Sequence, residues 1–256
     1  MNYVFDIMGP LLEGTGVTVQ VFLITLVISV PFGLCLALLR ISRFKVVSGL
    51  VNGYIWLMRG TPLMLQMLFI YFALPFVPVI GIRLPDFPAA IVAFVLNYAA
   101  YFAEIFRAGI QSIDRGQYEG ARVLGMSYTQ TMRRIVLPQA MRVIIPPAGN
   151  ETIGMLKTTS LVSIVTLAEL LYSAQSIYSR TFQTIPLLIV ASLWYLIMTS
   201  VLTIGQYYIE RHYAKGSARN VPLTPWQRFR RNFFTFHSPR PQPPDPTVTS
   251  SVGGIR

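Results

Sequence analysis

The chain has 256 residues, of which 53% are hydrophobic and only 12% are charged, and its mean hydropathy is +0.54. Soluble domains average about 45–50% apolar and about 25% charged residues, so this composition excludes an ordinary soluble domain and indicates a membrane protein with length for about five spans. The net charge of +11 does not indicate a nucleic-acid binder, because the basic residues border apolar segments or lie in one tail. The single cysteine, Cys35, lies in an apolar run and has no partner within the chain for a disulfide.

The first expected span covers residues 18–39 and is almost uninterrupted in its apolar character. Arg40, Arg43 and Lys45 follow it at once, whereas residues 1–15 contain acidic residues and no Lys or Arg. That beginning is not the basic start of a signal peptide. Because Lys and Arg concentrate on the cytoplasmic side, we expect 1–15 to be extracytoplasmic.

The second expected span, 54–76, is interrupted by Arg59-Gly60-Thr61-Pro62. It is either one span with a Gly/Pro break or a short interfacial helix followed by a span, since irregular backbone at membrane depth needs protein or a water-filled cavity around it. The third span, 87–107, ends with Glu104 and Arg107, whose spacing favours an ion pair within the helix near the inner boundary.

The fourth span, 143–171, is less hydrophobic and contains Pro146 and Pro147. An outside loop, 172–184, is expected next, followed by the last span, 185–209. In this arrangement the outside loops carry only Arg83 and Arg180. The sequence therefore predicts an all-α membrane protein with about five transmembrane helices in one domain, 16–211, with its N-terminus outside and its C-terminus in the cytoplasm.

Residues 212–256 form a basic, proline-rich tail. Two interpretations of this tail stay open. It is disordered because it is too polar to pack, or part of it is a short helix on the inner leaflet, capped by Thr224 and Pro225, with Trp226 and the phenylalanines that follow on one face.

The longest polar interruption, residues 116–138 of a loop expected at 111–138, contains two clear helix boundaries. Its first short helix is expected at about 117–124, with Gly125 ending it in the left-handed conformation. Ser127 and Gln130 form a capping box for a second helix, and Pro138 marks a turn into the next segment. The small residues Gly120 and Ala121 near Leu124, flanked by Glu119 and Arg122, would let a partner approach the backbone closely. A solvated connector is the simpler alternative.

The spacing of Glu119, Ala121, Gly125, Ile135, Leu137 and Pro138 resembles the EAA loop of ABC importer permeases, with Gly120 in place of the middle alanine as the only departure. Further stretches resemble the polar amino acid branch of that family, which includes histidine, glutamine, glutamate and arginine importers. These stretches are Arg59–Leu63, Ala103–Ile113, Leu137–Ala140, Gly149–Glu151, Leu156–Lys157, Thr159–Leu161 and Ala168–Leu171. The resemblance implies a MetI-like ABC permease fold, with a cytoplasmic loop that docks on an ATPase subunit through Gln117, Glu119, Gly120, Ala121, Arg122, Leu124, Gly125 and Pro138.

The resemblance also implies partners: an ABC ATPase subunit, an extracytoplasmic solute-binding protein, and a second permease that is identical or related. The expected location is the bacterial cell membrane, in contact with the lipid bilayer and not with nucleic acid. The chain has no Gly-rich phosphate loop ending in Lys-Ser/Thr, so ATP and Mg would be bound by the partner. We therefore expect no catalytic residue, cofactor or metal here. The alternatives are a permease of the same fold for another solute, or an ATP-independent secondary transporter or channel. A membrane enzyme has least support, because no catalytic constellation is visible.

Polar residues inside the spans are costly and usually face a cavity or each other. The candidates for the substrate pathway are Gln66, Asn97, Tyr101, Asn150, Glu151, Lys157, Thr158 and Ser160. Each has a structural alternative: Gln66 bridges helices, Asn150 and Glu151 satisfy backbone freed by the two prolines, Lys157 snorkels or pairs with a carboxylate, and the hydroxyls bond back to their own helix. Family members often carry an acid where this chain has Thr158, so the neutral hydroxyl favours glutamine or glutamate over a basic amino acid.

Overall fold

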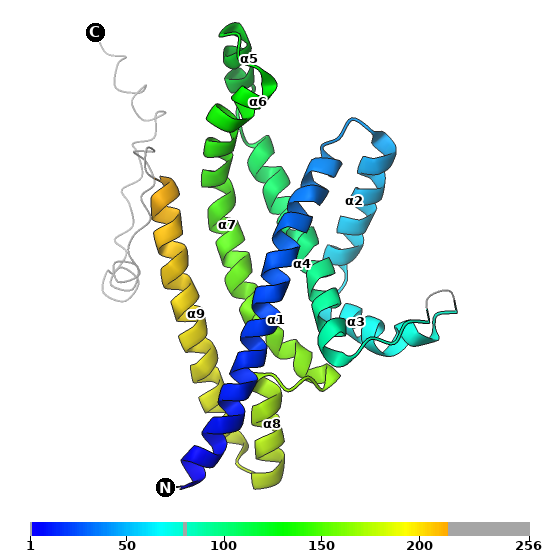
Figure 1. Cartoon of the computed structure of the whole chain (residues 1–256), viewed down its shortest axis with the longest axis vertical. Coiled ribbons are helices and arrows are strands. Elements are labelled where there is room, and N and C mark those ends of the chain that lie inside the picture. The colour runs from blue at the N-terminus through cyan, green and yellow to red at the C-terminus, as the bar shows by residue number, and fades with distance from the viewer. Residues whose placement is uncertain (1, 79–80, 215–256) are drawn as a thin grey trace, which may run out of the picture.

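A computed structural model describes residues 2–78 and 81–214, and its regular structure there is helical (Figure 1). The nine α-helices of this described part are α1 (Asn2–Arg40), α2 (Lys45–Gly60), α3 (Leu63–Leu68), α4 (Asp86–Gln111), α5 (Arg115–Val123), α6 (Tyr128–Thr131), α7 (Leu137–Thr158), α8 (Leu170–Thr181) and α9 (Thr184–Ala214). The predicted all-α fold is confirmed. The tail, including the helix expected after Thr224, lies outside the described residues.

Three helices in the described part are long and apolar enough to cross a membrane: Ile7–Arg40, Asp86–Gln111 and Thr184–Tyr213. They contain the expected spans 18–39, 87–107 and 185–209. Two further helix pairs pass the same test if each bent pair is taken as one span, which gives up to five. The segment 1–15 was expected as a terminus separate from the first span. In the structure α1 begins at Asn2, and Leu11 packs against Leu170 and Ala174 of α8.

The second expected span, 54–76, is not one straight helix. Helix α2 begins earlier, at Lys45, and the chain bends by 104° before continuing as α3, a π-helical turn (Phe69–Ala73) and a 3-10 turn (Leu74–Phe76). Thr61 and Pro62, between the two helices, are extended, as expected for a proline and the residue before it. Figure 1 shows α3 running sideways below α2.

The fourth expected span, 143–171, also differs from the structure, because one helical stretch runs from Tyr128 to Val165. Pro138 lies in the first turn of α7, directly after the π-helical turn Met132–Val136. The prediction that Pro138 turns the chain was wrong: a proline is tolerated in a first helical turn, and the wider turn before it lets the Leu137 N–H reach the Met132 carbonyl. Beyond Val165 the chain bends by 48° into α8, a helix where most of the outside loop 172–184 was expected.

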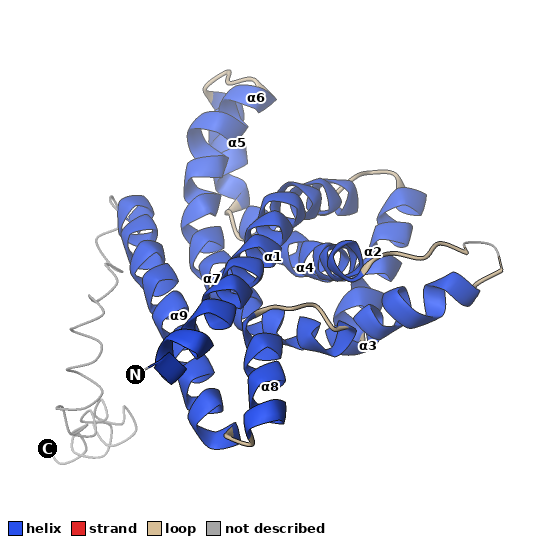
Figure 2. Cartoon of the chain, turned by 60° about the horizontal axis from the view of Figure 1, so that its bottom comes forward, coloured by secondary structure: helices blue, strands red, loops and turns tan. Residues whose placement is uncertain are grey.

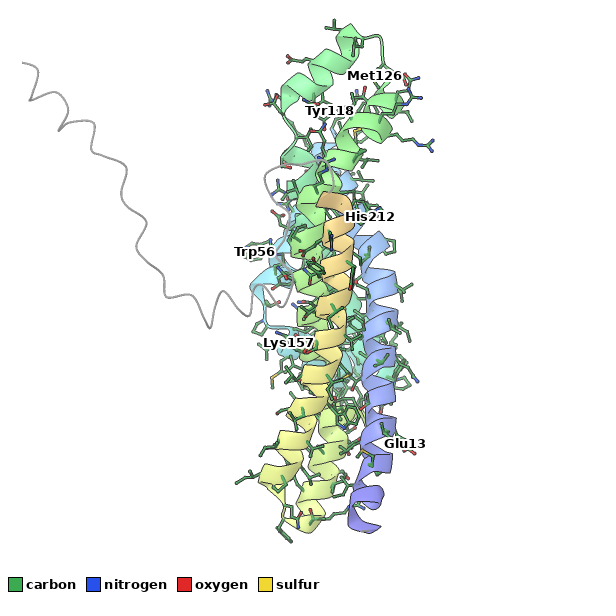
Figure 3. The ribbon with its side chains drawn as sticks, turned by 90° about the vertical axis from the view of Figure 1, so that its left-hand side faces the viewer. Glu13, Trp56, Tyr118, Met126, Lys157 and His212 are labelled. Carbon is green, nitrogen blue, oxygen red and sulfur yellow. The ribbon has the colours of Figure 1, made fainter. Side chains whose placement is uncertain are left out.

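Helices α1 and α4 form the centre of the molecule, between α7 and α2 (Figure 2). Their approach depends on Gly33, because a Cβ there would lie 2.7 Å from Cβ of Phe102 and 2.9 Å from the Ala99 carbonyl oxygen. Phe94 and Phe102 of α4 are completely or almost completely buried. The N-terminal end of α1, with Glu13, lies at the opposite end of the molecule from α5 and α6, which carry Tyr118 and the adjoining Met126 (Figure 3). One end of the long axis therefore carries the start of α1, which has acidic residues and no Lys or Arg, and the other end carries the arginine-containing loop 111–138.

Candidate functional site

The loop 111–138 is shaped by bonds among close neighbours. Asp114 caps α5 by accepting a hydrogen bond of 2.6 Å from the Gly116 N–H. At the other end, the Met126 N–H bonds the Ala121 carbonyl and the Gly125 N–H bonds the Arg122 carbonyl, with Gly125 at φ +71°. This pair of bonds is the Schellman motif, so the predicted left-handed end at Gly125 is confirmed.

The predicted capping box of the next helix is also confirmed. The Gln130 N–H donates to the Ser127 hydroxyl at 3.3 Å, and the Ser127 N–H donates to the Gln130 side-chain oxygen at 2.9 Å. Together with the cap at Asp114, these bonds satisfy backbone groups that a helix end leaves without a partner. The loop is thus a defined helix–turn–helix unit rather than an irregular connector.

This unit presents apolar side chains at its tip. Val123, Leu124 and Tyr128 are 87%, 77% and 75% exposed, and a Cβ added at Gly120 would meet nothing within 4 Å. We call these four residues the tip patch. Apolar residues gathered at the end of a polar loop mark a protein contact surface. Ala121 corrects the sequence-based prediction, because it is only 2% exposed and packs inward instead of facing a partner.

Among the other predicted coupling residues, Gln117 and Pro138 are exposed and also connect the loop to α7. The Gln139 side-chain amide of α7 donates to the Gln117 oxygen at 3.1 Å, which ties α5 to α7. Pro138 belongs to the first turn of α7. Glu119 and Arg122 are exposed beside the tip patch, as expected. Val123 and Tyr128 were missed by the sequence reasoning, although their apolar character in so polar a loop is a usable signal.

The break between α2 and α3 is closed by two amide side chains. Asn97 of α4 donates at 3.0 Å both to the Met58 carbonyl and to the Gln66 side-chain oxygen. The Gln66 amide donates to the Met58 carbonyl at 2.9 Å and to the Thr61 hydroxyl at 2.7 Å. Both residues therefore satisfy carbonyls freed by the bend. For Gln66 the structure shows the helix-bridging alternative.

A second group of polar residues belongs to α2, α4 and α7. The guanidinium of Arg59 lies 5.2 Å from the centre of the Tyr101 ring and within electrostatic range of Glu151. The Tyr98 hydroxyl lies beside Thr158 and also within range of Glu151. We call Arg59, Tyr98, Tyr101, Glu151 and Thr158 the polar cluster. It brings one cation, one carboxylate and hydroxyl groups of three helices near one another, with Arg59 exposed and Glu151 and Thr158 half-buried.

The remaining predicted pathway residues lie elsewhere or bond to their own helix. Asn150 accepts from Gln206 of α9 at 3.2 Å, and Gln206 also bonds the Pro146 carbonyl, so Asn150 joins α7 to α9. The hydroxyls of Thr158 and Ser160 donate to the Gly154 and Lys157 carbonyls, as the structural alternative holds. Lys157 is exposed on the side of the molecule that also carries Trp56 (Figure 3), and its side-chain ammonium has no hydrogen-bond or ion-pair partner within the described part of the chain.

Two carboxylates have structural roles. Glu104 pairs with Arg107, as the spacing predicted, and also with Arg40 at the end of α1. Glu169 is fully buried, accepts from the Tyr172 N–H and the Tyr195 hydroxyl at 2.8 Å each, and lies 3.4 Å from the Thr18 hydroxyl. It joins α1, α8 and α9. Its role was missed, because both of its hydroxyl partners are far away in the sequence.

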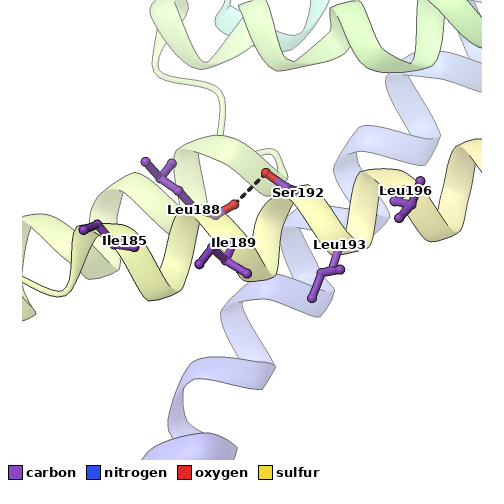
Figure 4. A pocket seen from close by; sticks show the side chains of 6 residues that line it. All are labelled: Ile185, Leu188, Ile189, Ser192, Leu193 and Leu196. Carbon is purple, nitrogen blue, oxygen red and sulfur yellow. Dashed lines mark hydrogen bonds between the residues drawn. The ribbon is translucent and has the colours of Figure 1, made fainter.

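The outer face of α9 is different in chemistry. A shallow groove of about 370 Å³ is lined by Ile185, Leu188, Ile189, Ser192, Leu193 and Leu196, and the Ser192 hydroxyl donates to the Leu188 carbonyl at 2.8 Å (Figure 4). With its hydroxyl bonded to its own helix, the groove presents almost purely apolar surface. Such a face suits acyl chains or another apolar helix and not a polar solute.

Residues 29–215 match the family described as binding-protein-dependent transport system inner membrane component. The chain belongs to this family. Family membership makes it a multi-pass membrane subunit of a transport system, which confirms the membrane class drawn from composition and the resemblance drawn from the EAA loop.

Relatives with assigned names are amino acid permeases. The chain is 41% identical over 215 residues to the arginine transport system permease protein ArgU of Corynebacterium glutamicum, covering 80% of this chain and 68% of that protein. It is 36% identical over 216 residues to the probable glutamine ABC transporter permease protein GlnM of Bacillus subtilis, covering 84% of this chain and 99% of that protein. These matches support the polar amino acid branch.

Solved structures confirm the fold. A crystal structure described as an amino acid ABC transporter with histidines is 36% identical and superposes with a TM-score of 0.76 over 82% of this chain and 97% of that chain. An inward-facing structure of the MetNI methionine ABC transporter is 19% identical, with a TM-score of 0.63 over 81% of this chain and 98% of that chain. The predicted MetI-like permease fold is thus shown.

Proposed function

We propose that this chain is the membrane-spanning subunit of an ATP-driven importer for amino acids, with glutamine or glutamate as the favoured substrates. The observation that carries the proposal is the tip patch, an exposed apolar surface on a helix that is tied to the spanning helix α7. A secondary transporter or channel needs no such surface. The names of the relatives, which include arginine and glutamine permeases, support an amino acid as the solute.

The tip patch is the proposed docking site for an ABC ATPase subunit, which would bind ATP and Mg in place of this chain. Open space at Gly120 lets the partner reach the backbone of α5, while Glu119 and Arg122 set orientation through charge. A solute-binding protein would approach the opposite end of the molecule, where α1 begins. In this arrangement the N-terminus is outside, the C-terminus is in the cytoplasm, and the chain itself performs no catalysis.

Coupling would run through one continuous helix. A movement of α5 is passed to α7 by the Gln117–Gln139 bond and by the unbroken helical stretch from Tyr128. Glu151 and Thr158 of the polar cluster lie further along that same stretch. ATP-driven closure of two docked ATPases would therefore shift Glu151 relative to Arg59 of α2, and a second permease copy, identical or related, would complete the path.

The polar cluster suits a zwitterion. An α-amino acid carries a carboxylate and an ammonium, and in a low-dielectric site each needs a partner of opposite charge. Arg59 is the proposed partner of the carboxylate and Glu151 of the ammonium, with Tyr101 and Thr158 as hydrogen-bonding groups. Thr158 adds no negative charge that could bind a basic side chain, so glutamine and glutamate are favoured over arginine as the substrate.

The test is ATPase activity of the reconstituted complex. The permease is reconstituted with its candidate ATPase and binding protein, and single amino acids are added in turn. We expect ATPase activity to rise with one loaded binding protein and to stay basal with the unloaded one, and glutamine or glutamate to give the rise. If solute crosses the membrane without any ATPase, the secondary-transporter alternative holds instead. Coupled activity with arginine alone would contradict only the substrate assignment.

A further inference from the structure

A basic pocket lies between the ends of α7 and α9 that are nearest to the loop 111–138, which we call the coupling loop. It has a volume of about 390 Å³. One face of the α7 stretch supplies Arg133, Leu137, Pro138, Met141 and Arg142, and the last turn of α9 supplies His212 and Tyr213. None of the roles assigned above involves this pocket as a site. Its lining combines an apolar floor with cationic and hydrogen-bonding groups.

The pocket lies at the edge of the spanning region and not at the docking surface. Thr184–Tyr213 is one of the helices apolar enough to span a membrane, and His212 is in its last turn. Figure 3 shows His212 well below the projecting loop that carries Tyr118 and Met126. A partner that contacts the tip patch therefore does not cover the pocket, which lies at the depth of the interfacial region of the bilayer.

The surroundings of the pocket favour an amphipathic occupant. Leu137 of α7 is 42% exposed, and Ile209 and Tyr213 of α9 are 53% and 40% exposed. Ile209 lies one turn before Tyr213 on the same face of α9, so this apolar surface continues from the pocket in the direction of the span. The carboxylate of Glu210, the acidic residue next to this end of α9, accepts a bond of 2.6 Å from Gln206. Acyl chains can cover the apolar surface while a negative headgroup meets Arg133 and His212.

We propose that the pocket binds the headgroup of an anionic phospholipid, with its phosphate against Arg133 and Arg142 and its acyl chains along α7 and α9. Basic pockets between spanning helices on the cytoplasmic side are suited to such headgroups. The sequence directly after Ala214 adds seven Lys or Arg residues against one acidic residue, Asp245, so positive charge continues beyond the pocket. The bound lipid connects the helix that transmits coupling to the helix that leads into the tail.

The test compares two neighbouring arginines. Arg133 lines the pocket, whereas Arg134 is also exposed and does not line it. The full-length protein and the variants Arg133→Gln and Arg134→Gln are purified, and native mass spectrometry measures retention of phosphatidylglycerol against phosphatidylcholine with the same acyl chains. Loss of one basic contact near the membrane surface corresponds to about a fivefold loss of binding. We expect that loss for Arg133→Gln and less than about a twofold loss for Arg134→Gln.

Three results would overturn the proposal. Equal effects of the two substitutions would show attraction by overall charge and not a site. Binding of inorganic phosphate alone, strong enough to displace phosphatidylglycerol at millimolar concentration, would make the ligand a free anion. Reduced co-purification of the ATPase with Arg133→Gln, at unchanged lipid retention, would make the pocket a protein contact. Retained size-exclusion behaviour and helical circular dichroism confirm that each variant is folded before binding is compared.

Discussion

The coupling loop and the break between α2 and α3 are both polar interruptions of apolar helices, but they are held in opposite ways. The loop is closed by bonds that span a few residues, such as Ser127 with Gln130. The break is closed from a distance, because Asn97 lies 39 residues from Met58 and 31 from Gln66 along the chain. The loop can therefore keep its shape while it moves as a unit, whereas the shape of the break depends on the packing of α4.

The largest expected effect comes from filling the open face of the loop. Gly120→Arg places a long charged side chain where a Cβ meets nothing within 4 Å, so the permease itself should fold and insert normally. Docking at the tip patch should fail, and transport coupled to ATP hydrolysis should fall by more than about 30-fold, the equivalent of roughly 2 kcal/mol at a binding hot spot.

Gly120→Ala is the matched control for that substitution, since one methyl group in open space should change coupling only slightly. Uptake and ATPase activity are measured together in proteoliposomes. Normal coupled uptake by Gly120→Arg would remove this face from the docking surface and leave the loop as a solvated connector.

The next largest effect compares two members of the polar cluster, the charged Glu151 and the hydroxyl of Thr158, which bonds to its own helix. Glu151→Gln removes the charge proposed to meet the substrate ammonium, and a hydrogen bond to a charged group is worth about 1.5–3 kcal/mol, so substrate affinity should fall by more than about tenfold. Thr158→Ala removes a neutral hydroxyl worth about 0.5–1.5 kcal/mol and should cost about two- to tenfold. Substrate-dependent ATPase activity gives both values, and an unchanged Thr158→Ala protein would exclude Thr158 from the path.

The long-range closure of the break predicts a loss of stability. Asn97 is 4% exposed, and Asn97→Leu leaves the Met58 carbonyl and the Gln66 oxygen without this donor, so the folded state should lose about 1–3 kcal/mol. Thermal unfolding in detergent measures the loss. Asn52→Leu is the control, because Asn52 is exposed and its side chain bonds the Ser48 hydroxyl of its own helix at 3.4 Å, so its change should cost less than about 0.5 kcal/mol. Equal losses for the two variants would show that the break is not held by Asn97.

The smallest expected effect lies in the capping box. Ser127→Ala removes the acceptor of the Gln130 N–H and should cost about 0.5–2 kcal/mol of local stability. Because the bonds are local, we expect faster hydrogen exchange at the Gln130 amide with little change in global unfolding. Thr129→Ala, at an exposed position of the same helix, serves as the control. A global loss as large as that of Asn97→Leu would contradict the contrast between the two regions.

The same contrast explains which predictions succeeded. Gly125, Ser127 and Gln130 were placed correctly because their bonding partners lie within five residues. The inward direction of Ala121 was misjudged, because the direction of a side chain depends on what packs around it. The bond of Asn150 to Gln206 of α9 could not be predicted for the same reason. Pro138 was read as a turn, but the π-helical turn before it lets the helix continue.

The sequence by itself determined the membrane class, the three long spanning helices, the local shape of the coupling loop and the family, since these rest on apolar run length, capping residues and motif spacing. Only the tertiary structure decided the 104° bend between α2 and α3 and the hydrogen bonds that close it. It also decided the polar cluster of Arg59 with Glu151, the burial of Glu169 and the basic pocket at Arg133. Each of these joins residues from different helices. Their contacts follow from how the helices pack, which apolar periodicity and local capping leave open.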